Sequence, residues 1–320
     1  MSFSSMTKNE LSRLPIEDRA CAVAELAAII KMNGAVQLNS KKGISLRFET
    51  ENAAIARRIF SLLKTLYDTN VEVMVRRNRQ LKKNNSYLIM VNSTKGTKKI
   101  LQDVGILTNK KGTSFLFDYK TPKELIEDMS NKRAYIRGAF LGGGSISNPE
   151  KAYHLEFVTS SEEHAEELSQ IINSFGLDSK IVARKGNYVV YLKEGQQIVD
   201  ILNIMGAHQA LLKFEDIRVF KDVRNNINRL VNCETANLGK TIEASIRQVE
   251  SIEYIDKKIG IDKLPKNLQE IAKLRLQNRE ASLKELGTML NPPVGKSGVN
   301  HRLRKIDEIA EELRRKENEL

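Results

Sequence analysis

The pattern of apolar positions divides most of the chain into two stretches with the same order of elements. Each stretch begins with an apolar helix that is rich in small residues, ends in glycine and runs into a β-branched position. These segments are Leu26–Val36 and Tyr135–Ile146. Glycines at the end of a helix let another backbone come very close. An internal duplication is therefore the first hypothesis that the pattern supports.

The elements predicted after each of these helices support the duplication. After Gly34 the pattern predicts a strand, an amphipathic helix, two strands and a helix, at Ile44–Phe48, Asn52–Tyr67, Val71–Val75, Tyr87–Val91 and Lys95–Val104. After Gly144 the same order recurs at Tyr153–Thr159, Glu162–Phe175, Lys180–Arg184, Tyr188–Leu192 and Gln196–Met205. Apolar residues in both middle helices recur at helical spacing. We predict an α+β domain over residues 1–225, with αβαββα repeats at about 20–105 and 132–215.

The two glycine-ended helices, LAAIIKMNG at Leu26–Gly34 and IRGAFLGGG at Ile136–Gly144, resemble the signature of LAGLIDADG homing endonucleases. The resemblance implies that the helices pack at a pseudo-twofold axis. It also implies an acidic, metal-holding residue just before the final glycine of each helix. The matching positions are Asn33 and Gly143, and neither is a carboxylate. A Mg²⁺ site for phosphodiester hydrolysis needs at least one or two carboxylates. We expect the fold without catalytic residues, metal or nuclease activity.

Composition favours an anionic partner. The chain has 320 residues, 41% hydrophobic residues and a net charge of +12, which suits about two domains and favours nucleic acid over an anionic membrane. The sequence shows no transmembrane stretch and no signal peptide. Cys21 and Cys233 are far apart, and no histidine has metal-ligand spacing. We expect a cytoplasmic protein that needs neither cofactor nor metal and does not bind membranes.

The densest run of positive charge lies between Met74 and Ile100, which contain eight Lys and Arg residues and no acid. Like charges repel one another unless a polyanion is near. We therefore predict secondary phosphate contacts at the hairpin tip by Arg76, Arg77, Arg79, Lys82 and Lys83. A soluble hairpin tip is the alternative.

Residues 106–131 form the bridge between the two repeats. We predict a short helix there at Lys123–Met129, because Pro122 is favourable in the first turn of a helix.

After the second repeat, we predict two helices, Leu211–Val231 and Glu234–Ile259, and assign residues 226–262 to a connector. In residues 263–320 we predict three further helices. The first runs from Pro265 to about Leu276, with Leu268, Ile271, Ala272 and Arg275 on one side. The second starts at a capping box formed by Ser282 and Glu285, buries Leu283, Leu286, Met289 and Leu290, and stops at Asn291-Pro292. The third is capped by Ser297, with Val299, Leu303 and Ile306 inward. This order predicts a helix-turn-helix.

The third helix has the residues of a DNA-reading element. No acid occurs from Val294 to Ile306. Asn and Arg suit the edges of adenine and guanine in the major groove, and a helix N-terminus favours a phosphate. The predicted DNA-binding residues are Lys296, Ser297, Asn300, His301, Arg302, Arg304 and Lys305. The alternative is an ordinary three-helix bundle with a basic, solvated face.

The segments Leu264–Ile306 and Asn228–Thr241 resemble the WhiA family, and this resemblance covers essentially the whole chain. It implies a degenerate LAGLIDADG-like domain joined to a helix-turn-helix, in a non-enzymatic, nucleoid-associated DNA-binding regulator. Such a regulator acts in cell division and chromosome segregation or in sporulation-linked transcription. Double-stranded DNA is the expected partner, and a further transcription or cell-division protein stays open. We expect a monomer or weak dimer. Two alternatives remain: an active LAGLIDADG-type endonuclease, and a regulator that senses a ligand or partner through the duplicated domain.

Overall fold

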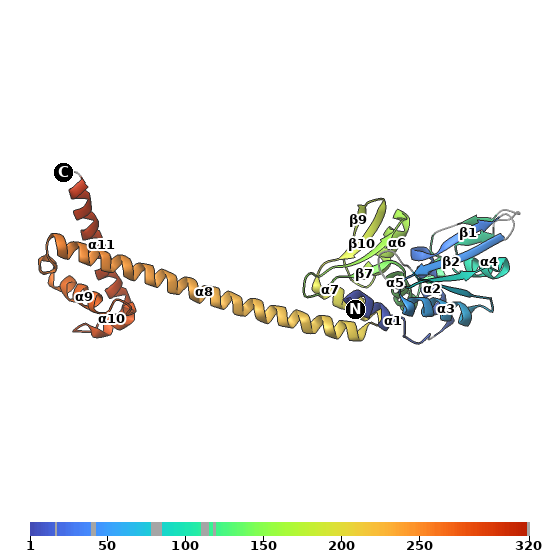
Figure 1. The fold of residues 1–320 in the computed structure, drawn as a ribbon, viewed down its shortest axis with the longest axis horizontal. Helices are drawn as coiled ribbons and strands as arrows, with labels where there is room; N and C mark the ends of the chain where they lie inside the picture. The colour runs from blue at the N-terminus through green and yellow to red at the C-terminus, as the bar shows by residue number, and fades with distance from the viewer. Residues whose placement is uncertain (17, 40–42, 78–84, 110–114, 118–119, 319–320) are drawn as a thin grey trace. The chain divides into compact units, whose positions relative to one another are not determined.

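The computed structural model describes residues 1–318 except 17, 40–42, 78–84, 110–114 and 118–119. The chain forms two compact units, Met1–Asp222 and Val223–Leu320 (Figure 1). Helix α8, His208–Lys258, begins in the first unit and ends in the second. Within the described ranges, no helix is both long enough and apolar enough to cross a membrane.

The first unit contains the predicted duplication. The first repeat consists of α2 (Arg19–Asn33), β1 (Ala35–Asn39), β2 (Gly43–Thr50), α3 (Ala53–Leu66), β3 (Glu72–Arg77), β4 (Asn85–Val91) and α4 (Thr94–Asp103). The second consists of α5 (Met129–Gly143), β7 (Gly144–Ile146), β8 (Leu155–Thr159), α6 (Glu162–Asn173), β9 (Lys180–Arg184), β10 (Asn187–Leu192) and α7 (Gly195–Met205). Their antiparallel sheets have the equivalent orders β1-β2-β4-β3 and β7-β8-β10-β9. The predicted fold class is confirmed, with one further strand in each repeat.

That further strand follows the glycine-ended helix directly. β1 pairs with β2, and β7 pairs with β8, through backbone hydrogen bonds that sequence periodicity does not reveal in such short segments. Outside the repeats lie α1 (Phe3–Leu11), the pair β5 (Leu107–Asn109) and β6 (Phe115–Phe117), and a 3₁₀ turn at Lys123–Leu125. The helix predicted at Lys123–Met129 is therefore wrong in extent, because α5 starts at Met129 with Asp128 at its N-cap.

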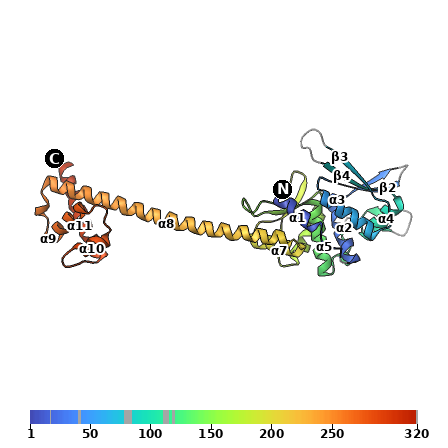
Figure 2. The ribbon, with the colours of Figure 1, turned by 60° about the horizontal axis from the view of Figure 1, so that its bottom comes forward.

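Helices α2 and α5 lie side by side at the centre of the first unit (Figures 1 and 2). Ten consecutive residues of α2, Cys21–Ile30, are buried. A Cβ added at Gly138 would lie 2.2 Å from the Glu25 carbonyl oxygen, and one at Gly142 would lie 2.7 Å from the Met32 Cβ. Glycine is therefore required where the two helix backbones meet.

A buried carboxylate lies in this contact. Glu25 of α2 has no exposed surface. Arg58 of α3 donates from Nε and Nη2 to its two carboxylate oxygens, over 2.7 and 2.8 Å, and Arg137 of α5 donates from Nε over 2.9 Å. A buried charge is strongly destabilising without such partners. The cluster thus joins α2, α3 and α5.

The break predicted in α8 near Asn232-Cys233 is wrong, because the helix runs without interruption from His208 to Lys258. Neither residue stops a helix by itself, and Gly239 within it is tolerated at a cost of about 1 kcal/mol relative to alanine.

Gly138→Ala should destabilise the chain by about 1–3 kcal/mol, because its methyl group collides with backbone atoms of α2. Urea unfolding followed by circular dichroism measures this effect. Gly239→Ala is the control: an added Cβ there has no neighbour within 4 Å, so the free energy of unfolding should stay unchanged or rise. Equal effects of the two substitutions would contradict the close approach of α2 and α5.

Candidate nucleic-acid interface

The second unit has its own apolar core. It is built from α9 (Lys266–Gln277), α10 (Leu283–Met289), α11 (Lys296–Asn318) and the end of α8. Of the inward positions predicted for the three helices, Leu268, Ile271, Leu286, Val299, Leu303 and Ile306 are buried there. Leu283, also predicted to be buried, is half-buried against this core. Ile252 and Ile255 of α8 belong to the same core, although they lie in the segment that we had assigned to the connector.

The start of α10 is fixed by the predicted capping box. The Ser282 hydroxyl oxygen accepts a hydrogen bond from the Glu285 backbone N–H over 3.3 Å, and the Glu285 carboxylate accepts one from the Ser282 N–H over 2.7 Å. The bond from the Ser282 backbone N–H, followed by the Ser282 side chain, holds the pKa of Glu285 below its usual value. The burial predicted for Met289 is wrong: its side chain is 48% exposed, because α10 ends there and the next residue, Leu290, fills the core.

The turn between α10 and α11 lies directly against α10. Val294 donates its backbone N–H to the Gly287 carbonyl over 2.9 Å, and a Cβ at Gly287 would lie only 2.1 Å from the Val294 oxygen. The Asn291 N–H donates to Glu270 of α9 over 3.2 Å. Backbone contacts therefore fix the angle at which the chain enters α11.

Helix α11 begins at Lys296, so the prediction that Ser297 caps it is wrong. The Gly295 carbonyl accepts the Val299 N–H over 3.1 Å, which places Gly295 at the N-cap and Ser297 in the first turn.

The outward face of α11 presents a set of side chains without protein partners. Lys296, Ser297, Asn300, His301, Arg304 and Lys305 are exposed. Arg302 is half-buried. Successive residues are about 100° apart around a helix, so Arg302 lies at the edge of the exposed face that contains Asn300 and Arg304. Across the described part of the chain, none of these seven side chains forms a hydrogen bond or ion pair. Their donors are available to an external acceptor.

The far end of α11 is held against α8. The Tyr254 hydroxyl donates to Glu317 over 2.6 Å, and Lys258 pairs with the same carboxylate. The Arg314 guanidinium lies 4.9 Å from the centre of the Tyr254 ring, in a cation–π contact. These contacts fix α11 against α8, and a rigid helix can hold binding side chains in a defined geometry.

In the first unit, the two positions that match the catalytic acids face strand carbonyls. Asn33 donates from Nδ2 to the Glu49 carbonyl over 3.1 Å. A Cβ at Gly143 would lie 2.8 Å from the Val158 carbonyl oxygen. A carboxylate at position 33 could not donate to the Glu49 carbonyl as the Asn33 amide does, and a side chain at position 143 would collide with its neighbours. Among the described residues, no group of three or more His, Cys, Asp or Glu is arranged to hold a metal ion.

The basic hairpin is described only in part. Arg76 and Arg77 end β3, whose residues are all exposed. Arg79, Lys82 and Lys83 lie outside the described residues. The charge of Arg76 acts on Glu49, whose pKa is lowered first by the hydrogen bond from the Ser86 hydroxyl, 3.0 Å away, and then by Arg47. Some of the positive potential on this surface is thus offset.

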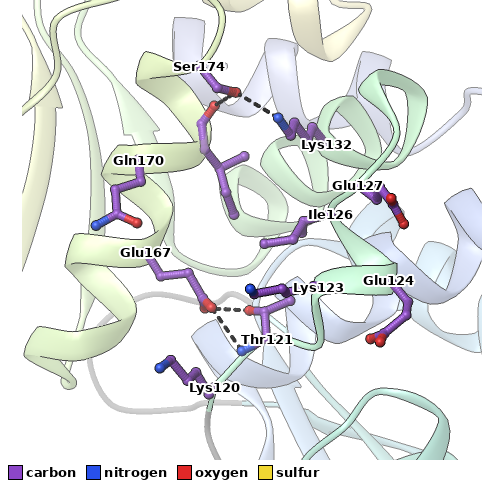
Figure 3. A pocket seen from close by; sticks show the side chains of 11 residues that line it. Lys120, Thr121, Lys123, Glu124, Ile126, Glu127, Lys132, Glu167, Gln170 and Ser174 are labelled. Carbon is purple, nitrogen blue, oxygen red and sulfur yellow. Dashed lines mark hydrogen bonds between the residues drawn. The ribbon is translucent and has the colours of Figure 1, made fainter.

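The segment 120–127, which precedes α5, lines a pocket of about 540 Å³ and is held there by hydrogen bonds (Figure 3). Glu167 of α6 accepts the Thr121 N–H over 2.9 Å, pairs with the Thr121 hydroxyl, and lies 3.2 Å from Lys31 Nζ. The Tyr135 hydroxyl bonds to Thr121 and to His164, over 3.1 and 3.0 Å. Burial, followed by the charge of Lys31, lowers the pKa of His164 to about 4. Lysines and glutamates both line the pocket, so its charge indicates no ligand class.

Three family models match successive parts of the chain. They are the "WhiA N-terminal LAGLIDADG-like domain" at residues 19–107, the "WhiA LAGLIDADG-like domain" at 132–224 and the "WhiA C-terminal HTH domain" at 227–310. A protein of Alkaliphilus metalliredigens (strain QYMF) named "Probable cell division protein WhiA" is 57% identical over 99% of both chains. The chain belongs to the WhiA family. A protein of the same name from Thermoanaerobacter pseudethanolicus is 58% identical over 98% of both chains.

Solved WhiA structures have the same fold. Full-length DUF199/WhiA from Thermatoga maritima, known from a crystal structure, is 27% identical, covers 98% of this chain and 99% of its own, and has a TM-score of 0.59. The N-terminal LAGLIDADG domain of DUF199/WhiA, at 24% identity, covers 64% of this chain and 90% of its own, with a TM-score of 0.50, and supports the fold alone. The predicted family and fold are therefore confirmed.

Sequence reasoning missed the role of Gly287. The signal was present, because a glycine inside a short predicted helix costs about 1 kcal/mol and usually has a packing reason. Here the reason is the turn that lies against α10.

Ser282→Ala should lower the free energy of unfolding by about 1 kcal/mol, because it removes the N-cap of α10. Thermal unfolding of the full-length chain without DNA measures the change. Ser297→Ala is the matched control and should leave stability almost unchanged, because Ser297 caps no helix. A larger loss for Ser297→Ala would mean that α11 begins elsewhere.

Proposed function

We propose that this chain is a non-enzymatic, sequence-selective DNA-binding protein that reads double-stranded DNA with α11. The observation that carries the proposal is the outward face of α11, where exposed cationic and amide side chains have no protein partner among the described residues. A second helix of a helix-turn-helix normally enters the major groove with its first turns.

The residues of α11 take different roles in this proposal. Asn300 and Arg304 lie one helical turn apart, and their side chains suit bidentate contacts to adenine and guanine. Lys296 and Ser297 contact a phosphate at the helix N-terminus. His301 and Lys305 lie beside the base-reading pair, and Arg302, at the flank, contacts the backbone. Such phosphate contacts position the protein without reading sequence.

The first unit contributes a secondary, non-specific contact through the basic hairpin. Arg76 and Arg77 at the end of β3 contact phosphates, together with Arg79, Lys82 and Lys83. The absence of carboxylates at Asn33 and Gly143 supports a function without phosphodiester cleavage. No metal or other cofactor takes part in this proposal. In this proposal residues 263–320 read the DNA sequence, residues 226–262 are the connector, and residues 1–225 contribute the secondary contact.

The biological role is proposed from the relatives, which carry the name "Probable cell division protein WhiA". We infer that DNA binding serves cell division and chromosome segregation, or sporulation-linked transcription. The setting would be the cytoplasm, on the nucleoid, with the chain acting as a monomer or weak dimer. Another transcription or cell-division protein is a candidate partner.

Asn300→Ala combined with Arg304→Ala in the full-length chain should weaken binding to a preferred genomic fragment by tenfold or more, since each bidentate base contact contributes about 1–3 kcal/mol. Fluorescence anisotropy across a salt series measures this. Wild-type affinity should fall steeply with salt, because phosphate contacts release counterions.

The control removes the same kind of charge from the far end of α11. Arg315→Ala with Lys316→Ala should leave the preference for the fragment intact, because both side chains are exposed well beyond the first turns. Unchanged affinity of the Asn300/Arg304 variant would contradict the assignment of the reader. Cleavage of the DNA by the wild-type chain with Mg²⁺, seen on a gel, would restore the endonuclease reading.

A further inference from the structure

A small pocket in the first unit is lined by two arginines. It has a volume of about 240 Å³ and lies where α5, the end of α7 and the first residue of α8 meet. Its polar side chains include Ser130, Arg133 and Arg137 of α5, Asn203 of α7, and His208. The described residues that line it include neither Asp nor Glu. This sets it apart from the pocket in Figure 3, which is lined by both lysines and glutamates.

Arg137 brings unused hydrogen-bond donors to this pocket. Its Nε donates to Glu25 over 2.9 Å, but its two Nη groups have no acceptor in the described part of the chain. Only 14% of the side chain is exposed, so bulk water surrounds little of it. A guanidinium in such surroundings is stabilised by an acceptor that enters the pocket.

The Glu25 carboxylate is shared by two guanidinium groups. This single carboxylate already accepts from Nε and Nη2 of Arg58, so one negative charge faces two guanidinium groups. Arg133 adds a further positive charge. Its guanidinium carbon lies 5.9 Å from the centre of the Phe175 ring, a contact that leaves the charge in place.

We propose that this pocket binds the phosphate group of a small molecule. Guanidinium groups present planar pairs of donors that match phosphate oxygens. The Ser130 hydroxyl and the His208 ring add further donors. The volume lies below the ~300–1,000 Å³ typical of sites for drug-sized ligands, so the occupant is inorganic phosphate or a small phosphorylated compound.

The N-terminus of α8 is not the source of this site. Its Gln209 and Ala210 N–H groups donate to the Glu10 carboxylate over 2.7 and 2.9 Å. The arginines of α5 therefore carry the recognition. All lining residues belong to the first unit, whereas α11 belongs to the second, so this inference does not rest on the proposed DNA reading.

Isothermal titration calorimetry of the full-length chain tests the proposal, with inorganic phosphate, ribose 5-phosphate and ribose as probes. Phosphate and ribose 5-phosphate should bind and ribose should not. Tighter binding of ribose 5-phosphate than of phosphate assigns the site to phosphorylated compounds, and the reverse assigns it to the free ion. No binding of either phosphate probe overturns the proposal.

Arg133→Gln and Arg137→Gln should each weaken phosphate binding about tenfold or more, since each removes a charge-assisted hydrogen bond. Arg133 is exposed and makes no contact with Glu25, so Arg133→Gln decides the test even if Arg137→Gln fails to fold. Lys132→Gln is the matched control. It removes one positive charge from the same helix, but Lys132 lines the other pocket and donates to Ser174. Equal weakening by Lys132→Gln and Arg133→Gln would show only a general charge effect and overturn the site.

Discussion

The contact between α2 and α5 holds the first unit together. At Gly138 the backbones of the two helices meet so closely that a methyl group would overlap the Glu25 carbonyl. The Glu25 side chain is buried in the same place and depends on Arg58 and Arg137. Because each repeat supplies one of these helices, this contact fixes how the two sheets sit relative to each other. The cationic pocket beside Arg137 is a consequence of the same cluster.

The two repeats keep this core and differ at their surfaces. Asn33 of the first repeat has a side chain that donates to a strand carbonyl, whereas Gly143 of the second leaves no room for one. A site that needs paired carboxylates at these positions cannot form from these residues. Exposed donors without a partner among the described residues lie on α11 of the second unit, on a helix that backbone contacts and Tyr254 hold in place.

Local signals predicted much of this structure. The duplication, the three final helices, the capping box at Ser282 and the buried face of α11 follow from periodicity and capping chemistry, which act within a few residues. Contacts between distant residues were not predictable in this way. The bond between Glu25 and Arg137 joins positions 112 residues apart, and the strands β1 and β7 exist through their pairing partners. Met289 is exposed because α10 ends at that residue, and α11 starts at Lys296, before Ser297. Local signals do not define helix ends to within a single residue.

Selection of bound sequences from random double-stranded DNA tests the central claim most directly. The full-length wild type, Asn300→Ala alone, and Arg76→Ala with Arg77→Ala would be compared. If α11 reads the bases, Asn300→Ala relaxes the preference at a defined base pair, and the hairpin variant recovers the wild-type sequence in lower yield. If Asn300→Ala keeps the full preference while the hairpin variant loses it, the reader lies in the first unit and the account is wrong.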